Sequence, residues 1–155
     1  MASLRRWGWR LRMLLLLLGL LLGLSWWLQR PPAPSVGPER VAEHFTRCGT
    51  GGDFSCVIDG DSFRLGKRRI RIRGIDAPER EGACLAETAL AERSVAKLVE
   101  LLNAGPFTMT TVGKSERDQY GRELRVVSRG GRSIGEAMVA SGLAHDYRGK
   151  KTNWC

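Results

Sequence analysis

The first 30 residues contain no acidic residue, and the chain of 155 residues shows no internal repeat. The absence of a repeat excludes solenoids and propellers, which are built from periodic units. The absence of acid leaves the arginines of the first segment unbalanced, so this segment carries more than half of the formal net charge of +9. The remainder keeps a moderate basic surplus, which fits an anionic partner such as nucleic acid without requiring one.

Charge is also missing from Met13 to Leu28, a leucine-rich run that follows several arginines and ends near Trp26 and Trp27. A membrane-spanning helix needs about 20 apolar residues, so the run is slightly short unless the flanking arginines reach the headgroups. A cleaved signal peptide is the alternative, but bulky tryptophans stand where a small-x-small cleavage site is expected. We therefore predict that residues 1–30 form a signal anchor in the inner membrane, with the N-terminus in the cytoplasm. The rest would be periplasmic or otherwise extracytoplasmic, and it would be secreted if the segment is cleaved.

Proline is concentrated in residues 31–38, and such a composition favours an extended spacer without packed structure. We therefore expect a Pro-rich linker over residues 31–47. Residues 48–155 are expected to form one compact domain, because their number suits a single hydrophobic core.

The four cysteines show no C-x-x-C spacing and the chain has only two histidines, so a zinc site is the weaker interpretation. An even number of cysteines in a small exported domain favours two disulfides, for which three pairings are possible. We favour Cys48 with Cys56, which are close in sequence, and Cys84 with Cys155, which would tie down the chain end. Buried free thiols are the remaining alternative.

Apolar periodicity predicts five strands and two helices after the linker. The expected strands are 54–58, 62–65, 68–75, 107–112 and 123–128, and the expected helices are 83–103 and a short one from the capping box Ser133–Glu136 to Gly142. This order suggests an α+β, mainly β fold: a small closed five-stranded OB-fold Greek-key barrel with two to three helices, preceded by an N-terminal hydrophobic helix.

Three charged clusters hold the groups needed to cut a phosphodiester bond. They are Asp59-Gly60-Asp61-Ser62, Arg71 leading to Asp76-Ala77-Pro78-Glu79, and Asp118-Gln119-Tyr120-Gly121-Arg122. Carboxylates, a backbone carbonyl and waters make an oxygen site that calcium accepts. A further carboxylate can deprotonate water, and arginine forks can bind phosphate.

Each of these residues also has a structural explanation when it is considered alone. Asp59 and Asp61 are common types in a hairpin turn, for which Gly60 would supply a permissive backbone conformation. Glu79 could be a solvated loop acid, and Arg71 could be one of several exposed arginines on its strand. The order and spacing of the clusters therefore carry more information than any single residue.

Four motifs in order resemble the staphylococcal nuclease (thermonuclease) family. They are Val57-Ile58-Asp59-Gly60-Asp61-Ser62, Arg71 to Glu79, Asp118-x-Tyr120-Gly121-Arg122 and Met138-Val139-Ala140-Ser141-Gly142-Leu143-Ala144. The resemblance covers residues 54–147. It implies an OB-fold barrel and Ca²⁺-dependent hydrolysis of DNA and RNA to products with 3′-phosphates. We expect single strands to be the preferred substrate.

The resemblance also implies roles for individual residues. Asp61, Asp76 and the backbone carbonyl of Ala77 resemble the calcium ligands, and Asp59 an acid that acts through the metal's water. Arg71 and Arg122 resemble the catalytic phosphate-binding arginines, and Glu79 the residue that activates water. Tyr120, Tyr147 and Lys150 are candidates for substrate binding.

The chain departs from the family pattern at two places. Gln119 stands where a phosphate-binding lysine can occur, and the tyrosines beyond the last helix are reduced to Tyr147, which Arg148-Gly149-Lys150-Lys151 follows. Binding of the terminal phosphate and base is therefore expected to depend on Lys and Arg more than on aromatic stacking.

These observations favour a Ca²⁺-dependent endonuclease anchored outside the inner membrane. The alternative is a non-catalytic nucleic-acid-binding OB module at the cell envelope, and a weaker one is a structural envelope protein. No protein partner is inferred from the sequence.

Overall fold

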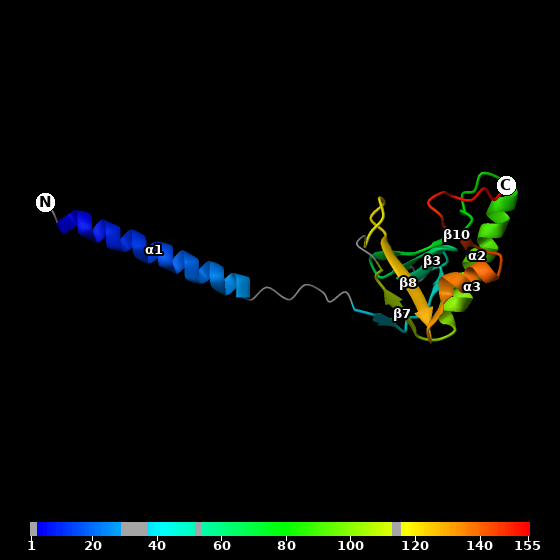
Figure 1. Cartoon of the computed structure of the whole chain (residues 1–155), viewed down its shortest axis with the longest axis horizontal. Coiled ribbons are helices and arrows are strands. Elements are labelled where there is room, and N and C mark those ends of the chain that lie inside the picture. Colours follow the sequence, from blue (N-terminus) through cyan, green and yellow to red (C-terminus); the bar gives the residue numbers. More distant parts are fainter. Residues whose placement is uncertain (1–2, 29–36, 52–53, 113–115) are drawn as a thin grey trace. The chain divides into compact units, whose positions relative to one another are not determined.

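A computed structural model describes residues 3–28, 37–51, 54–112 and 116–155. The chain divides into two units, residues 1–35 and residues 36–155 (Figure 1). The first unit contains helix α1 (Ser3–Leu28). Among the described residues, no helix combines the length and apolarity needed to cross a membrane. The signal anchor of the sequence analysis is not confirmed by this finding and stays a prediction.

The second unit is built on a curled β-sheet in which the strands follow the order β1-β7-β8-β5-β4-β3-β2, with β9 paired to β8 (Figure 1). The strands are β1 (Glu39–Val41), β2 (Thr46–Arg47), β3 (Ser55–Asp59), β4 (Ser62–Leu65), β5 (Arg68–Ile72), β7 (Phe107–Thr110), β8 (Glu123–Arg129) and β9 (Arg132–Ser133). All five strands predicted from periodicity are present, and most of their ends lie within one or two residues of the predicted positions. The parallel pairing of β5 with β8 joins two antiparallel parts, β3-β4-β5 and β1-β7-β8, and β2 at the end of the sheet is parallel to β3.

The predicted α+β, mainly β class is confirmed, but the sheet is a curled half-barrel and not a closed barrel. Its two ends are β1 and β2, and no pairing joins them in the described part of the chain. Both strands are short. Within the described ranges β1 bonds only to β7 and β2 only to β3, so no described strand pairs with the other edge of either.

The third predicted strand, 68–75, is interrupted in the structure. Gly74 has a φ of +86°, a backbone conformation that favours glycine, and it separates β5 from β6 (Ile75–Asp76). Strand β6 pairs with β10 (His145–Asp146) in a second small sheet. The break therefore turns Asp76 away from the main sheet and toward the C-terminal part of the chain.

Part of the predicted linker is folded. Residues 39–41 form β1 and residues 46–47 form β2. Between them, the fully buried side chain of Phe45 packs edge-on against Phe63 with ring centroids 5.4 Å apart. Asn103 fixes the backbone there, because its side chain accepts from the Phe45 N–H and donates to the Phe45 carbonyl, both at 2.8 Å. The proline-rich composition ends at Pro38, and residues 29–36 lie outside the described residues.

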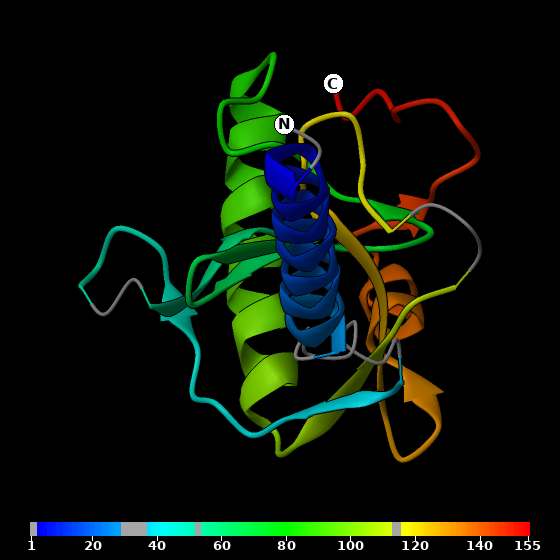
Figure 2. The same ribbon diagram turned by 90° about the vertical axis from the view of Figure 1, so that its left-hand side faces the viewer.

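Two helices cover the sheet. Helix α2 (Leu85–Asn103) packs against β3, and α3 (Ile134–Ala140) against β8 (Figure 2). Ser133 caps the N-terminus of α3 as predicted, since the Glu136 N–H donates to its hydroxyl, which is one of the two hydrogen bonds of a capping box. The core between helices and sheet contains Phe63, Ile70, Leu98, Phe107, Val127 and Met138, all 2% exposed or less.

Candidate active site

The turn between β3 and β4 is held tightly against α2. A Cβ atom on Gly60 would lie 1.7 Å from Ser94 Oγ and 2.9 Å from the Ala77 Cβ, so only glycine fits. Ser94 is itself buried and donates to the Leu143 carbonyl at 2.8 Å. Gly60 is not among the described glycines with positive φ, so its role is close approach and not the permissive conformation expected from the sequence. This packing fixes the position of Asp61.

Asp61 and Asp76 converge on the guanidinium group of Arg71. Arg71 Nη1 lies 2.8 Å from Asp61 Oδ2, and Nη2 lies 3.7 Å from Asp76 Oδ1. The three side chains are 11% exposed or less. The register places them together, because Ser62 is paired with Arg71 and the Ile72 N–H donates to the Asp61 carbonyl at 2.8 Å. Two buried carboxylates therefore share one cation.

Burial raises the pKa of Asp61 to about 7, although the nearby Arg71 guanidinium acts in the opposite direction. A hard cation at this point would favour the ionised carboxylate. The contacts of the Asp61 carboxylate with Arg71 and with the Ala77 N–H at 3.3 Å are both made by Oδ2, which leaves Oδ1 directed to neither. The donor set fits Ca²⁺, which takes carboxylate and carbonyl oxygens together with water.

The acidic residues do not form a larger cluster. Within the ranges that the structure describes, no group of three or more His, Cys, Asp or Glu side chains is arranged to hold a metal ion. Asp59 Oδ2 accepts from Ser62 Oγ at 3.5 Å, and the Glu79 carboxylate pairs with Lys151. The predicted calcium ion would therefore be coordinated by two carboxylates, the Ala77 carbonyl and water molecules.

Glu79 lies on a loop whose two ends are joined by one buried carboxylate. Glu87, in the first turn of α2, accepts from the Glu79 N–H at 3.3 Å through Oε1 and from the Ala83 N–H at 2.7 Å through Oε2. It is 8% exposed. The backbone of Glu79 is thus positioned by α2, which the sequence analysis did not anticipate.

Arg122 belongs to a turn that closes on Asp118. Asp118 Oδ1 accepts from the N–H groups of Tyr120 and Arg122, both at 2.9 Å, and Oδ2 accepts from Arg122 Nε at 2.6 Å. Gly121 has a φ of +75°, which this turn requires. Burial acts to raise the pKa of Asp118, but the Arg122 side chain and the N–H groups of Arg122 and Tyr120 together outweigh it and keep this pKa below its ordinary value. The aspartate therefore orients the guanidinium group of Arg122.

One cleft of about 950 Å³ brings the predicted catalytic residues together. Its walls include Arg71, Glu79, Arg122, Tyr120 and Tyr147. Arg69, Arg73 and Lys151 also line it, so cationic side chains outnumber the acidic ones, which are Asp59, Glu79 and Asp118. This charge balance suits a polyanion.

The structure places the predicted residues in three groups. Arg71, Glu79, Arg122, Asp59, Tyr120 and Tyr147 line the cleft, whereas Asp61, Asp76 and Ala77 are buried beside it. Lys150 is exposed and does not belong to the cleft wall. Its neighbour Lys151 does line the wall, although in the sequence it stands out only as part of a basic run.

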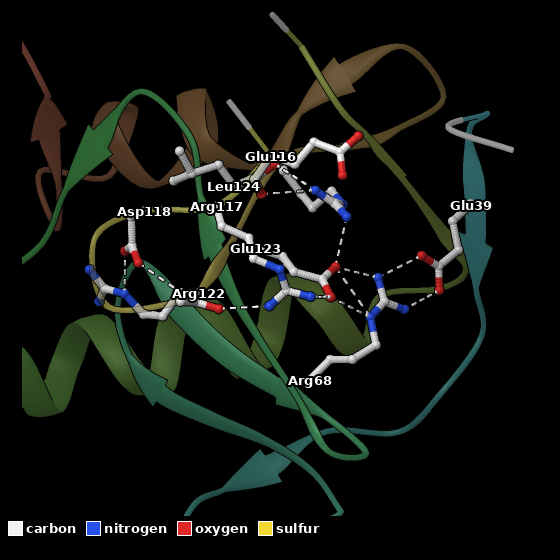
Figure 3. Close-up of polar contacts among 10 residues, drawn as sticks. Glu39, Arg68, Glu116, Arg117, Asp118, Arg122, Glu123 and Leu124 are labelled. Carbon is white, nitrogen blue, oxygen red and sulfur yellow. Dashed lines mark hydrogen bonds and ion pairs between the residues drawn. The ribbon is translucent and has the colours of Figure 1, made fainter. Parts of the chain in front are cut away.

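A network centred on Glu123 supports this site from β8 (Figure 3). The buried Glu123 carboxylate lies 2.7 Å from Arg68 and from Arg125, and 3.2 Å from Arg117. Arg68 also pairs with Glu39 of β1. Arg117 Nη1 donates to the Gly121 carbonyl at 2.8 Å, so the network reaches the turn that carries Arg122.

We expect Glu123→Gln to lower the free energy of unfolding by about 2 kcal/mol at neutral pH, because hydrogen bonds to charged groups contribute about 1.5–3 kcal/mol. The bond with Arg68 is the main cause that lowers the pKa of Glu123 below its ordinary 4.5. The stabilisation should therefore be complete above about pH 4.5 and be lost as the pH falls through the lowered folded-state value. Urea unfolding at about pH 7 and about pH 3 measures the difference.

Glu116→Gln is the matched control, because this neighbouring side chain is exposed, and among the described residues the hydrogen bonds of Glu116 are made by its backbone carbonyl. An equal loss in both variants, or a Glu123→Gln loss that does not shrink in acid, would contradict the prediction.

The disulfides are Cys48–Cys56 and Cys84–Cys155, the pairing favoured from the sequence. The described residues contain no free cysteine. The second bridge joins the end of the chain to the residue that precedes α2, close to the loop of Glu79.

Comparison with known proteins gives a family match and two relatives. Residues 69–154 match the family described as Staphylococcal nuclease homologue, which leaves the Asp59–Ser62 motif upstream of the matched region. The chain is 30% identical over 95 residues to "Succinoglycan biosynthesis protein ExoI" of Rhizobium meliloti (strain 1021), covering 58% of this chain and 49% of the relative. It is also 30% identical over 92 residues to "Endonuclease YncB" of Bacillus subtilis (strain 168), covering 57% of this chain and 44% of the relative. The aligned region spans about half the length of these curated relatives.

Proposed function

Because the chain belongs to the staphylococcal nuclease family, with more than half of its residues matched, we propose that it is a Ca²⁺-dependent nuclease that hydrolyses DNA and RNA. The observation that carries this proposal is the arrangement of Arg71, Glu79 and Arg122 around one cleft, beside the buried carboxylates Asp61 and Asp76. The name of the Bacillus relative is in agreement with it.

The proposed reaction assigns each group a separate task. Glu79 takes a proton from the attacking water as its oxygen bonds to phosphorus. Arg71 and Arg122 donate hydrogen bonds to the phosphate oxygens, where negative charge increases in the transition state. The P–O5′ bond then breaks, the leaving oxygen takes up a proton from solvent water, and the product keeps a 3′-phosphate.

Asp61, Asp76 and the Ala77 carbonyl would hold the calcium ion, with Asp59 acting through water. When bound, Ca²⁺ supplies positive charge that polarises the phosphate. Asp61 and Asp76 then serve as fixed ligands, and Arg71 keeps further N–H donors for the substrate, since a guanidinium group has five.

Cleavage of labelled single-stranded DNA and RNA by the purified full-length chain tests the function. We expect hydrolysis with millimolar Ca²⁺, its loss when a chelator is added, and product ends that become extendable only after phosphatase treatment. If the DNA is bound and stays intact in Ca²⁺, the protein is a nucleic-acid-binding module and the nuclease proposal fails. Product 3′ ends that can be extended without phosphatase treatment would contradict the assigned bond cleavage.

We also propose that the domain works outside the cytoplasm, attached through residues 13–28 to the inner membrane. Two disulfides support the export part of this proposal, because such bonds persist in oxidising compartments. Fractionation of cells that produce the tagged chain should then recover it with membranes, and recovery in the cytoplasmic fraction would contradict the proposal.

A further inference from the structure

The C-terminal segment Tyr147–Cys155 is attached to the active site at several points. The Tyr147 N–H donates to the Gly74 carbonyl at 2.9 Å, and the Thr152 N–H donates to Asp76 Oδ2 at 2.9 Å. Cys155 is bonded to Cys84 at the start of α2, as the approach of the C-terminus to α2 in Figure 1 illustrates. A segment with these attachments has a defined path past Asp76.

Further contacts hold the end of this segment in place. The Trp154 ring stacks on His145 of β10 with centroids 4.4 Å apart. Cys155 Sγ also lies 3.9 Å from Glu87 Oε2, the carboxylate that positions the Glu79 loop. The C-terminal segment and the Glu79 loop are therefore both fixed by the start of α2.

Lys151 brings a positive charge from this segment to the cleft. Its ammonium group forms an ion pair with the Glu79 carboxylate, and both residues line the cleft. The hydrogen bond with Glu79 raises the pKa of Lys151, so this side chain stays charged at neutral pH. Lys151 is 65% exposed and Glu79 41%, and exposed ion pairs of this kind are weak. An incoming anion can therefore replace the carboxylate.

We propose that Lys151 is a substrate-binding residue that exchanges Glu79 for a phosphate group of the nucleic acid. The Cys84–Cys155 bridge holds it in reach. The inference rests on the proposed function, because it assumes that the cleft takes a nucleic acid. Substrate binding then has a second effect: the ammonium group leaves Glu79, and the carboxylate becomes available to accept a proton from water.

Binding of a short single-stranded oligodeoxynucleotide to the full-length chain, measured in EGTA at several salt concentrations, tests this inference without cleavage. Lys151→Gln is expected to bind about fivefold more weakly at low salt. It should also reduce the slope of log K against log salt by about 0.7, the value for one phosphate contact on a single strand. Lys151→Arg keeps the charge and should restore most of the affinity.

Lys67→Gln is the matched control, because Lys67 is an exposed lysine in the turn at the opposite end of β4 from Asp61. It should leave affinity and slope unchanged. The double variant Cys84→Ser/Cys155→Ser should lose as much affinity as Lys151→Gln does. Combining it with Lys151→Gln should lower the affinity no further. Circular dichroism of each variant establishes that it is folded, and Lys151→Gln and Lys151→Arg test the proposal even if the cysteine variant does not fold.

Two results would overturn the inference. Wild-type affinity and slope in Lys151→Gln would show that the lysine has a structural role only. Tighter binding or faster cleavage in that variant would show that Lys151 obstructs the cleft. Failure of the nuclease proposal is distinguishable, since it would appear as intact DNA in Ca²⁺ with the binding differences still present, whereas loss of all nucleic-acid binding in the wild type would overturn both.

Discussion

Replacing Arg71 by alanine is expected to lower kcat by about 10³ to 10⁵, because a positioned arginine supplies that much in phosphoryl transfer. The structure gives a second reason for a large effect. Arg71 is the cation shared by the buried carboxylates of Asp61 and Asp76, with Nη1 2.8 Å from Asp61. Removing one partner of a buried ion pair costs about 3–5 kcal/mol of stability.

The loss of stability and the loss of catalysis in Arg71→Ala can be separated with calcium. If Ca²⁺ binds between the carboxylates, it should raise the Tm of Arg71→Ala more than that of the wild type, since the variant lacks the compensating charge. Single-turnover cleavage at saturating Ca²⁺ then measures the catalytic loss alone. Arg71→Lys should regain stability more than activity, because lysine keeps the charge without the planar fork.

Arg40→Ala is the control for this experiment, since Arg40 is an exposed arginine on β1, outside the cleft wall. It should cleave as the wild type does. Near-normal kcat in a folded, Ca²⁺-saturated Arg71→Ala protein would remove Arg71 from the proposed reaction.

Local sequence patterns were sufficient to predict most elements of the domain. The alternation of arginine and isoleucine predicted β5, in which Ile70 and Ile72 are buried, and the capping box predicted the start of α3. These features depend on residues a few positions apart, where the periodicity of strand or helix decides which side chains share a face. Cysteine number and spacing left three pairings possible, and the favoured one, Cys48–Cys56 with Cys84–Cys155, is the one in the structure.

The parts that the sequence did not predict depend on contacts between distant residues. Strands β1 and β2 are two or three residues long, too short for a periodic pattern, and only pairing with β7 and β3 defines them. The ammonium group of Lys151 reaches Glu79 across 72 positions, and the Thr152 N–H reaches Asp76 across 76. The order of the motifs therefore predicted which residues gather in the cleft. The residues that they contact could be identified only from the folded structure.

Replacing Glu79 by glutamine is expected to lower kcat by about 10² to 10⁴, the usual contribution of general acid–base catalysis. Glutamine has nearly the same size and keeps the loop contacts, because Glu87 bonds to the backbone N–H of residue 79 and not to its side chain. The variant loses only the proton acceptor and the partner of Lys151. Stability and the Ca²⁺ concentration for half-maximal binding should therefore stay close to those of the wild type.

The effect of Glu79→Gln on DNA binding should be opposite to its effect on cleavage. In the wild type the Glu79 carboxylate pairs with Lys151 and repels phosphate. The variant is therefore expected to bind single-stranded DNA as tightly as the wild type or more tightly. Glu81→Gln is the control, since Glu81 is an exposed acid two positions further along the same loop and does not line the cleft that contains Arg71 and Arg122. Cleavage by Glu79→Gln at the rate of Glu81→Gln would mean that another group accepts the proton, and Asp59, which lines the same cleft, would be the next residue to replace.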